Sequence, residues 1–170
     1  MLSESARMCS ADEALFRVQK PNSKPRDIKV IALDPPSEAL VRQLAEGSWV
    51  HAAFFNASSF AVTPEHDQRV SIDGCLRDLD GNPRTLIDEV TGADLVVMVA
   101  APGGNAQAAA EVGEACSLKR VNTAAFISHT TSASDDAVAK TLAQVRPWSL
   151  MVVFTETDTY IEDMLIALRA

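Results

Sequence analysis

The residues best suited to chemistry stand in short polar segments, each of which follows an apolar run of the sequence. The ligand-binding candidates in these segments are Asp34, Asn56, Ser58, Asn105, Thr130 and Glu156, and the candidate general base is His129. Carboxylates, amides and hydroxyls hold ligands through hydrogen bonds, and an imidazole transfers protons near neutral pH. If the apolar runs are parallel strands, their carboxyl ends meet at one edge of a sheet. The sequence therefore predicts that these side chains share one site.

A glycine-containing turn, residues 101–105, separates an apolar run from an alanine-rich helical pattern. Gly103 and Gly104 permit a positive φ and a close approach of the backbone to a ligand, and the amides at a helix N-terminus favour an anion. The turn lacks G-x-G-x-x-G, and it lacks the phosphate-binding lysine of G-x-x-x-x-G-K-[ST]. Asn105 is also a suitable helix N-cap. Two interpretations remain: a simple turn, or a contact with a nucleotide or another small anionic ligand.

Asp34 follows the first apolar run and is followed by Pro35 and Pro36. The prolines remove two backbone N–H donors, and the carboxylate would repel a phosphate, so a dinucleotide with its pyrophosphate at this turn is not expected. Asp34 is predicted to cap the following helix. The alternatives are a contact with a ribose hydroxyl, an amine or a metal ion.

His129 ends the fourth apolar run, next to hydroxyl-bearing residues. It is predicted either to act as a general base, oriented by Asp34 or Glu156, or to hydrogen-bond a loop carbonyl. No metal site is predicted, because the run from Asp73 to Asn82 lacks the spacing of a calcium loop and the three cysteines lack C-x-x-C spacing. No cofactor follows from these motifs.

The elements that must position these residues are apolar runs alternating with helical patterns. The apolar runs are 28–33, 49–55, 94–100, 121–128 and 149–155, and helical patterns follow at about 34–47, 86–92, 105–119, 134–146 and 158–170. This alternation is typical of a parallel sheet with helices on both faces. The predicted fold is a three-layer, Rossmann-like, doubly wound α/β domain with a mainly parallel five-stranded sheet.

Residues 28–170 are predicted to form this single domain. Residues 1–27 read as an N-terminal arm and linker, with a short helix over 10–19. A long insertion at about 57–85 interrupts the alternation and is expected to be a hairpin or a partner-binding flap.

Composition excludes several classes of function. The 170 residues are 47% apolar and carry a net charge of -8, with no basic patch, which argues against nucleic-acid and anionic-membrane partners. No apolar stretch approaches the roughly 20 residues that span a bilayer, and the N-terminus shows no secretory signal. With only three cysteines, we expect a cytoplasmic protein with reduced thiols.

The stretch from Gly92 to His129, a strand, a glycine turn, an alanine-rich helix and a second strand, resembles the nucleotide-binding half of the tubulin-like bacterial division GTPases. The resemblance implies a Rossmann-like fold. Where that family has a long glycine- and threonine-rich phosphate loop, this sequence keeps only Gly103 and Gly104. This departure from the family argues against GTP hydrolysis and filament formation.

Three functional hypotheses follow. The first is a non-catalytic or regulatory domain with a degenerate nucleotide- or anion-type site at the carboxyl edge of the sheet. The second is an enzyme acting on a small polar substrate, with His129 as its general base. The third is an assembly protein, a homo-oligomer or a partner of another protein, without a small ligand.

Overall fold

The computed structural model describes residues 24–57, 75–157 and 159–170. The predicted helix over 10–19, most of the N-terminal arm, and Ser58 with most of the insertion lie outside the described residues. So does Asp158.

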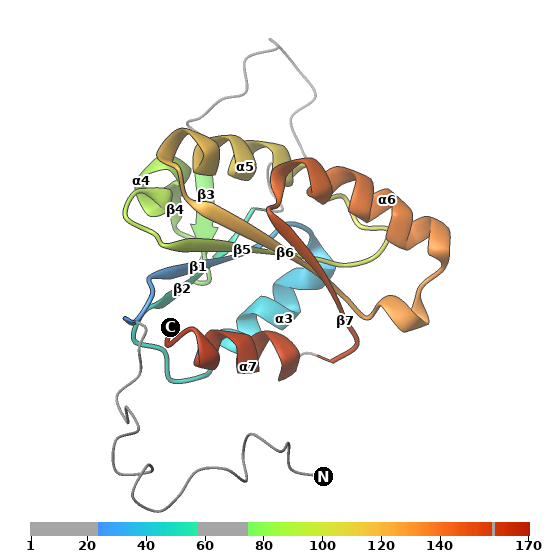
Figure 1. Cartoon of the computed structure of the whole chain (residues 1–170), viewed down its shortest axis with the longest axis horizontal. Coiled ribbons are helices and arrows are strands. Elements are labelled where there is room, and N and C mark those ends of the chain that lie inside the picture. Colours follow the sequence, from blue (N-terminus) through green and yellow to red (C-terminus); the bar gives the residue numbers. More distant parts are fainter. Residues whose placement is uncertain (1–23, 58–74, 158) are drawn as a thin grey trace, which may run out of the picture.

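The core of the fold is a seven-stranded mixed sheet (Figure 1). Its strands are β1 (Ile28–Ala32), β2 (Ala52–Asn56), β3 (Cys75–Asp78), β4 (Pro83–Thr85), β5 (Leu95–Ala100), β6 (Asn122–Ser128) and β7 (Met151–Thr155). They are ordered β4-β3-β2-β1-β5-β6-β7. Strands β2, β1, β5, β6 and β7 pair in parallel, whereas β3 runs antiparallel to both β2 and β4.

Helices cover both faces of the sheet (Figure 1). They are α3 (Pro35–Ala45), α4 (Leu86–Val90), α5 (Ala108–Lys119), α6 (Asp135–Val145) and α7 (Thr159–Ala167), with short 3₁₀ turns η2 (Thr130–Ser132) and η3 (Arg146–Trp148). One apolar core joins α4, α5 and α6 to one face, and a second joins α3 and α7 to the other. Successive strand residues alternate between these cores, as the pleat requires. For example, Val97 packs in the second core and Met98 in the first.

The predicted count of five strands was wrong. Each predicted apolar run does contain a strand, but β3 and β4 form an additional hairpin in the described part of the insertion. The hairpin alternative predicted for the insertion agrees with this pair. The two strands were left out of the predicted sheet because they are short and contain Arg77, Pro83 and Arg84, residue types that carry little strand signal. Asp78 accepts hydrogen bonds from the backbone N–H groups of Asp80 and Asn82, which closes the hairpin turn.

Helix α5 packs closely enough that Gly113 is required. A Cβ at this position would lie 2.5 Å from Trp148 Cβ, and no real side chain tolerates that distance. No helix of the described segments is both long and apolar enough to cross a membrane.

Candidate functional site

The candidate residues lie at one edge of the sheet because they follow strands that run in the same direction. Asp34 follows β1, Asn56 ends β2, and the glycine turn follows β5. His129 and Thr130 follow β6, and Glu156 follows β7. In such a sheet a ligand crevice is expected between the loops after β1 and β5, where the chain reverses its direction of progress across the sheet.

Asp34 is fully buried between these two loops. Its Oδ1 accepts a hydrogen bond of 2.9 Å from the N–H of Ser37, so the predicted helix cap is confirmed. Its Oδ2 accepts a second bond of 2.9 Å from the N–H of Ala101, across the crevice. Burial raises the pKa of Asp34, while the bonds from Ala101 and Ser37 act in the opposite direction. The carboxylate thus joins the loops after β1 and β5.

The glycine turn lies directly against this carboxylate. A Cβ on Gly104 would stand 2.7 Å from Asp34 Oδ2, so only glycine allows this contact without displacing the carboxylate. Gly103 adopts φ = 78°, a left-handed conformation that suits glycine. Both glycines are therefore explained by the path of the chain.

The backbone donors of the turn are engaged within the protein. The N–H of Gly103 donates to Thr141 Oγ1 at 2.9 Å and to Ala137 O at 3.0 Å. The N–H of Gly104 donates to the carbonyl of Ala101 at 3.2 Å. The N–H of Ala106 donates to Gln144 Oε1 at 2.8 Å.

Asn105 does not cap α5, contrary to expectation. The helix begins at Ala108 after Gln107, and Asn105 Oδ1 instead accepts from the N–H of Gln107 at 3.2 Å within the turn. The exposed side chain of Asn105 is the part of the turn nearest to solvent.

Helix α6 supplies contacts that sequence reasoning missed. Ala137, Thr141 and Gln144 are spaced to lie on one helix face; Ala137 and Thr141 accept from Gly103 in the glycine turn, and Gln144 accepts from Ala106 just after it. Thr141 is fully buried and also donates to the carbonyl of Ala101 at 3.1 Å. The sequence offered one signal for these contacts: Thr141 lies on the buried side of an amphipathic helix, where a hydroxyl group needs a hydrogen-bond partner.

A second polar cluster lies at the ends of β6 and β7. Thr130 Oγ1 donates to Glu156 Oε1 at 2.9 Å, and the N–H of Thr131 donates to Glu156 Oε2 at 3.2 Å. His129, next to this cluster, is exposed and adopts φ = 53°. Left-handed backbone is uncommon outside glycine, although His tolerates it better than most residues. Asn56 is half-buried at the end of β2.

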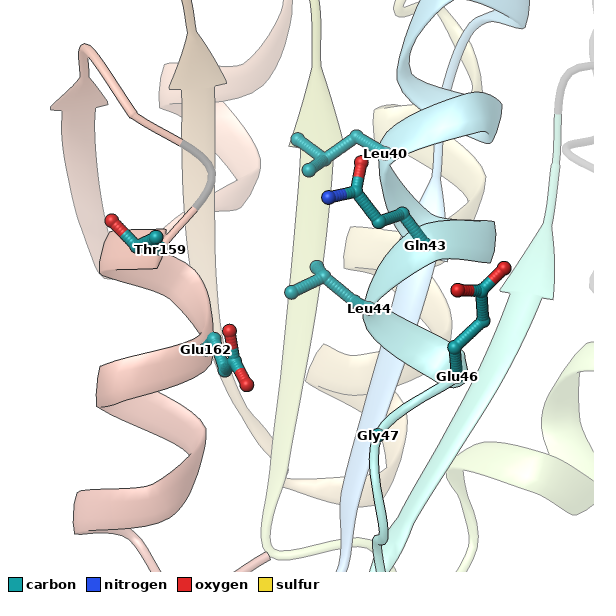
Figure 2. A pocket seen from close by; sticks show the side chains of 7 residues that line it. All are labelled: Leu40, Gln43, Leu44, Glu46, Gly47, Thr159 and Glu162. Atoms are coloured by element: carbon teal, nitrogen blue, oxygen red, sulfur yellow. The ribbon is translucent and has the colours of Figure 1, made fainter.

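Two hollows of about 330 Å³ each lie away from the crevice. One lies between α3 and α7, where Figure 2 shows Leu40 and Leu44 projecting from α3 and Glu162 standing on α7; none of the candidate residues lines it. The other lies beside β7, and its lining is Thr130, Asp135, Val138, Ala139, Leu142 and Phe154. Thr130 is the candidate residue in this second lining, and the other members are mostly apolar.

Within the described segments, no group of three or more His, Cys, Asp or Glu side chains is placed to hold a metal ion. Cys116 is buried in α5, and burial raises the pKa of its thiol to about 12, so it stays protonated at neutral pH. No protein-family model matches the chain, and a search of the curated proteins finds no relative.

Proposed function

We propose that the chain is a non-catalytic, Rossmann-like regulatory domain in which a nucleotide-type crevice is closed by the protein's own side chains, and which acts by binding another protein surface. The doubly wound arrangement is supported by the parallel order β2-β1-β5-β6-β7 and by helices on both faces. In such folds the ligand crevice lies where the chain reverses direction, here between β1 and β5.

One observation carries the proposal: the buried carboxylate of Asp34 bridges the crevice. It accepts from Ser37 on one side and from Ala101 on the other. A phosphate group placed about 4 Å from it would meet a repulsion on the order of 4 kcal/mol at an effective dielectric constant of 20. The crevice therefore opposes the ligand that this position usually binds.

The glycine turn supports the same conclusion. A phosphate loop offers free backbone amides to the ligand. Here the N–H groups of Gly103, Gly104 and Ala106 already donate to protein acceptors. Phosphate would have to displace Thr141 and Gln144 of α6 before it could use the amides of Gly103 and Ala106.

Thermal unfolding with GTP, ATP and inorganic phosphate tests the proposal. A ligand at 100 times its Kd would stabilise the fold by about 2.7 kcal/mol, which raises the Tm of a domain this size by roughly 5–11 °C. We expect no rise with any of the three. A specific rise that Asn105→Ala abolishes would overturn the proposal and favour an anion site at the turn instead.

The left-handed backbone of His129 favours a second candidate, an enzyme on a small polar substrate. His129 would be the general base, with Thr130 and Glu156 beside it. A turnover that His129→Ala abolishes, and that His129→Gln does not restore, would support this candidate over the first.

A further inference from the structure

The two edges of the sheet differ in how they are protected against pairing with another chain. At one edge, β4 is three residues long, all three of its residues are exposed, and it contains Pro83, which has no N–H, and the charged Arg84. These are the usual protections of an edge strand. At the other edge, β7 runs for five residues, Met151–Thr155, with neither a proline nor a charge. Within the described residues, therefore, β7 alone offers an edge that a further strand could extend.

The β7 edge also exposes large apolar side chains. Leu150 is 79% exposed, and Met151 and Phe154 are each 50% exposed. Val152 packs against the core under α5 and α6, and Val153 packs against the opposite core. Because side chains alternate along a strand, Phe154 shares the face of Val152. Leu150 immediately precedes β7, and its N–H donates to the carbonyl of Thr123 on β6 at 3.1 Å, which continues the strand pairing by one residue and places Leu150 on the same face.

Helix α6 continues this surface. Asp135, Val138, Ala139 and Leu142 line the hollow beside Phe154. Their spacing places them on one helix face, and the next position on that face is the exposed Arg146. We call the combination of this α6 stripe with Leu150 and Phe154 the β7 face. Its α6 stripe is acidic at one end, apolar in the middle and basic at the other end.

We infer that the β7 face binds a second copy of this chain, with the two β7 strands antiparallel about a two-fold axis perpendicular to the sheet. Antiparallel pairing reverses α6 between the copies. Asp135 of one copy then lies toward Arg146 of the other, so the ends of the two stripes attract each other. Parallel pairing of the two β7 strands would turn the second sheet over and place the two α6 helices on opposite faces, where their charged ends could not meet.

The spacing and the register fit this arrangement. In the paired sheet, β6 of one copy would lie three strand spacings, about 14 Å, from β6 of the other. Because α6 packs on β6, the two α6 helices would be separated by a similar distance. Helices in direct contact lie only about 8–10 Å apart, so large side chains are needed between the two α6 helices. A register centred on Val152 supplies them, because it sets Leu150 opposite Phe154 of the second copy.

Strand pairing is not opposed by charge, although each chain carries a net charge of -8. No residue of β7 is charged, so the paired strands place no like charges opposite each other. This inference deepens the proposed function by naming its partner. It is tested separately, since a monomer that binds no nucleotide would refute the dimer and leave the closed crevice standing.

Light scattering coupled to size exclusion gives the first test. We expect the full chain to show twice its mass of 18.2 kDa. Phe154→Glu places two carboxylates in the apolar centre of the interface and is expected to return the mass to 18.2 kDa. Val50→Glu is the matched control, because Val50 is 83% exposed and lies before β2, outside the β7 face, so its variant is expected to stay dimeric. Circular dichroism and Tm establish that each variant is folded.

Exchanging the charges of Asp135 and Arg146 distinguishes a loss of the contact between the two copies from a loss of the structure of α6. Asp135→Arg and Arg146→Glu each set like charges together, and each is expected to weaken dimerisation at least tenfold. The double variant restores opposite charges and is expected to recover the dimer. A wild-type mass of 18.2 kDa at every concentration refutes the inference, as does a dimer that resists Phe154→Glu or a double variant weaker than both single ones.

Discussion

The buried carboxylate of Asp34 gives the sharpest prediction about stability. In Asp34→Ala the N-terminus of α3 loses its cap, which costs about 0.5–2 kcal/mol. The N–H of Ala101, which donates to Asp34 Oδ2 at 2.9 Å, also loses its partner. An unsatisfied buried donor costs about 1–3 kcal/mol.

A second effect offsets part of this loss. Burial raises the pKa of Asp34, so the ionised carboxylate is held in the fold at some cost, and alanine removes that cost. We therefore expect Asp34→Ala to lower the free energy of unfolding at pH 7 by about 2 kcal/mol, which corresponds to a Tm lower by roughly 4–8 °C.

The sign of the pH dependence follows from the same shift. The pKa is higher in the folded state than the ordinary 3.8 of an aspartate, so the folded state binds the proton more tightly. The contribution of Asp34 to stability is then greatest below pH 3.8 and falls as the pH rises through the folded-state pKa. The difference in free energy of unfolding between the wild type and Asp34→Ala should therefore decrease as the pH rises.

Urea unfolding, followed by tryptophan fluorescence, measures these differences. Trp49 reports on α3 directly, because its Nε1 donates to the carbonyl of Leu44 at 2.7 Å. Asp136→Ala is the matched control: Asp136 is an exposed aspartate in the first turn of α6, where the cap is Ser134, so its removal should cost less than about 1 kcal/mol. If Asp34→Ala costs no more than Asp136→Ala, the bridging role is wrong. If Asp34→Ala fails to fold, Ser37→Ala, which removes only the reciprocal half of the cap, should still lower stability by about 1 kcal/mol.

Three further predictions concern the helices over the glycine turn. Gly113→Ala should destabilise the fold by about 1–3 kcal/mol in urea, because the new Cβ meets Trp148; a gain in stability would contradict the packing. Thr141→Val removes the hydroxyl that accepts from Gly103 and should lower the free energy of unfolding by about 1–3 kcal/mol. A Tm equal to that of the wild type would refute this prediction. Among the described residues, Glu111 Oε2 is buried without a hydrogen-bond partner, and burial raises the pKa of this side chain. Burial destabilises the ionised carboxylate, so Glu111→Gln should raise the Tm at pH 7. Below pH 4.5 the carboxyl group is protonated, and the difference in Tm between the variant and the wild type should vanish. A higher Tm of the variant that persists in acid would refute the role of burial.

Much of the fold could be predicted because its signals are local. The apolar runs identified the five parallel strands, since a strand covered on both faces needs apolar residues on both sides. Strands β3 and β4 lie at the margin of the sheet, where charged residues and Pro83 are tolerated, so their sequence carried no such run. The predicted start of the alanine-rich helix at Asn105 was early, because the turn continues to Gln107.

In the candidate site, too, local contacts could be predicted from the sequence and contacts between distant residues could not. The cap at Asp34 could be predicted from the Asp-Pro-Pro-Ser sequence alone. Its bond to Ala101 joins residues 67 positions apart and depends on how the loops after β1 and β5 meet. The engagement of the glycine turn by Thr141 and Gln144 likewise depends on the packing of α6, which periodicity does not determine.

Amide hydrogen exchange followed by NMR gives the decisive test of whether the protein's own groups close the crevice and the glycine turn. The amides of Ala101, Gly103 and Ala106 donate within the protein, so they should exchange slowly, and millimolar phosphate should neither shift their resonances nor change their exchange. Rapid exchange of these three amides, with resonances that move on addition of phosphate, would contradict the account.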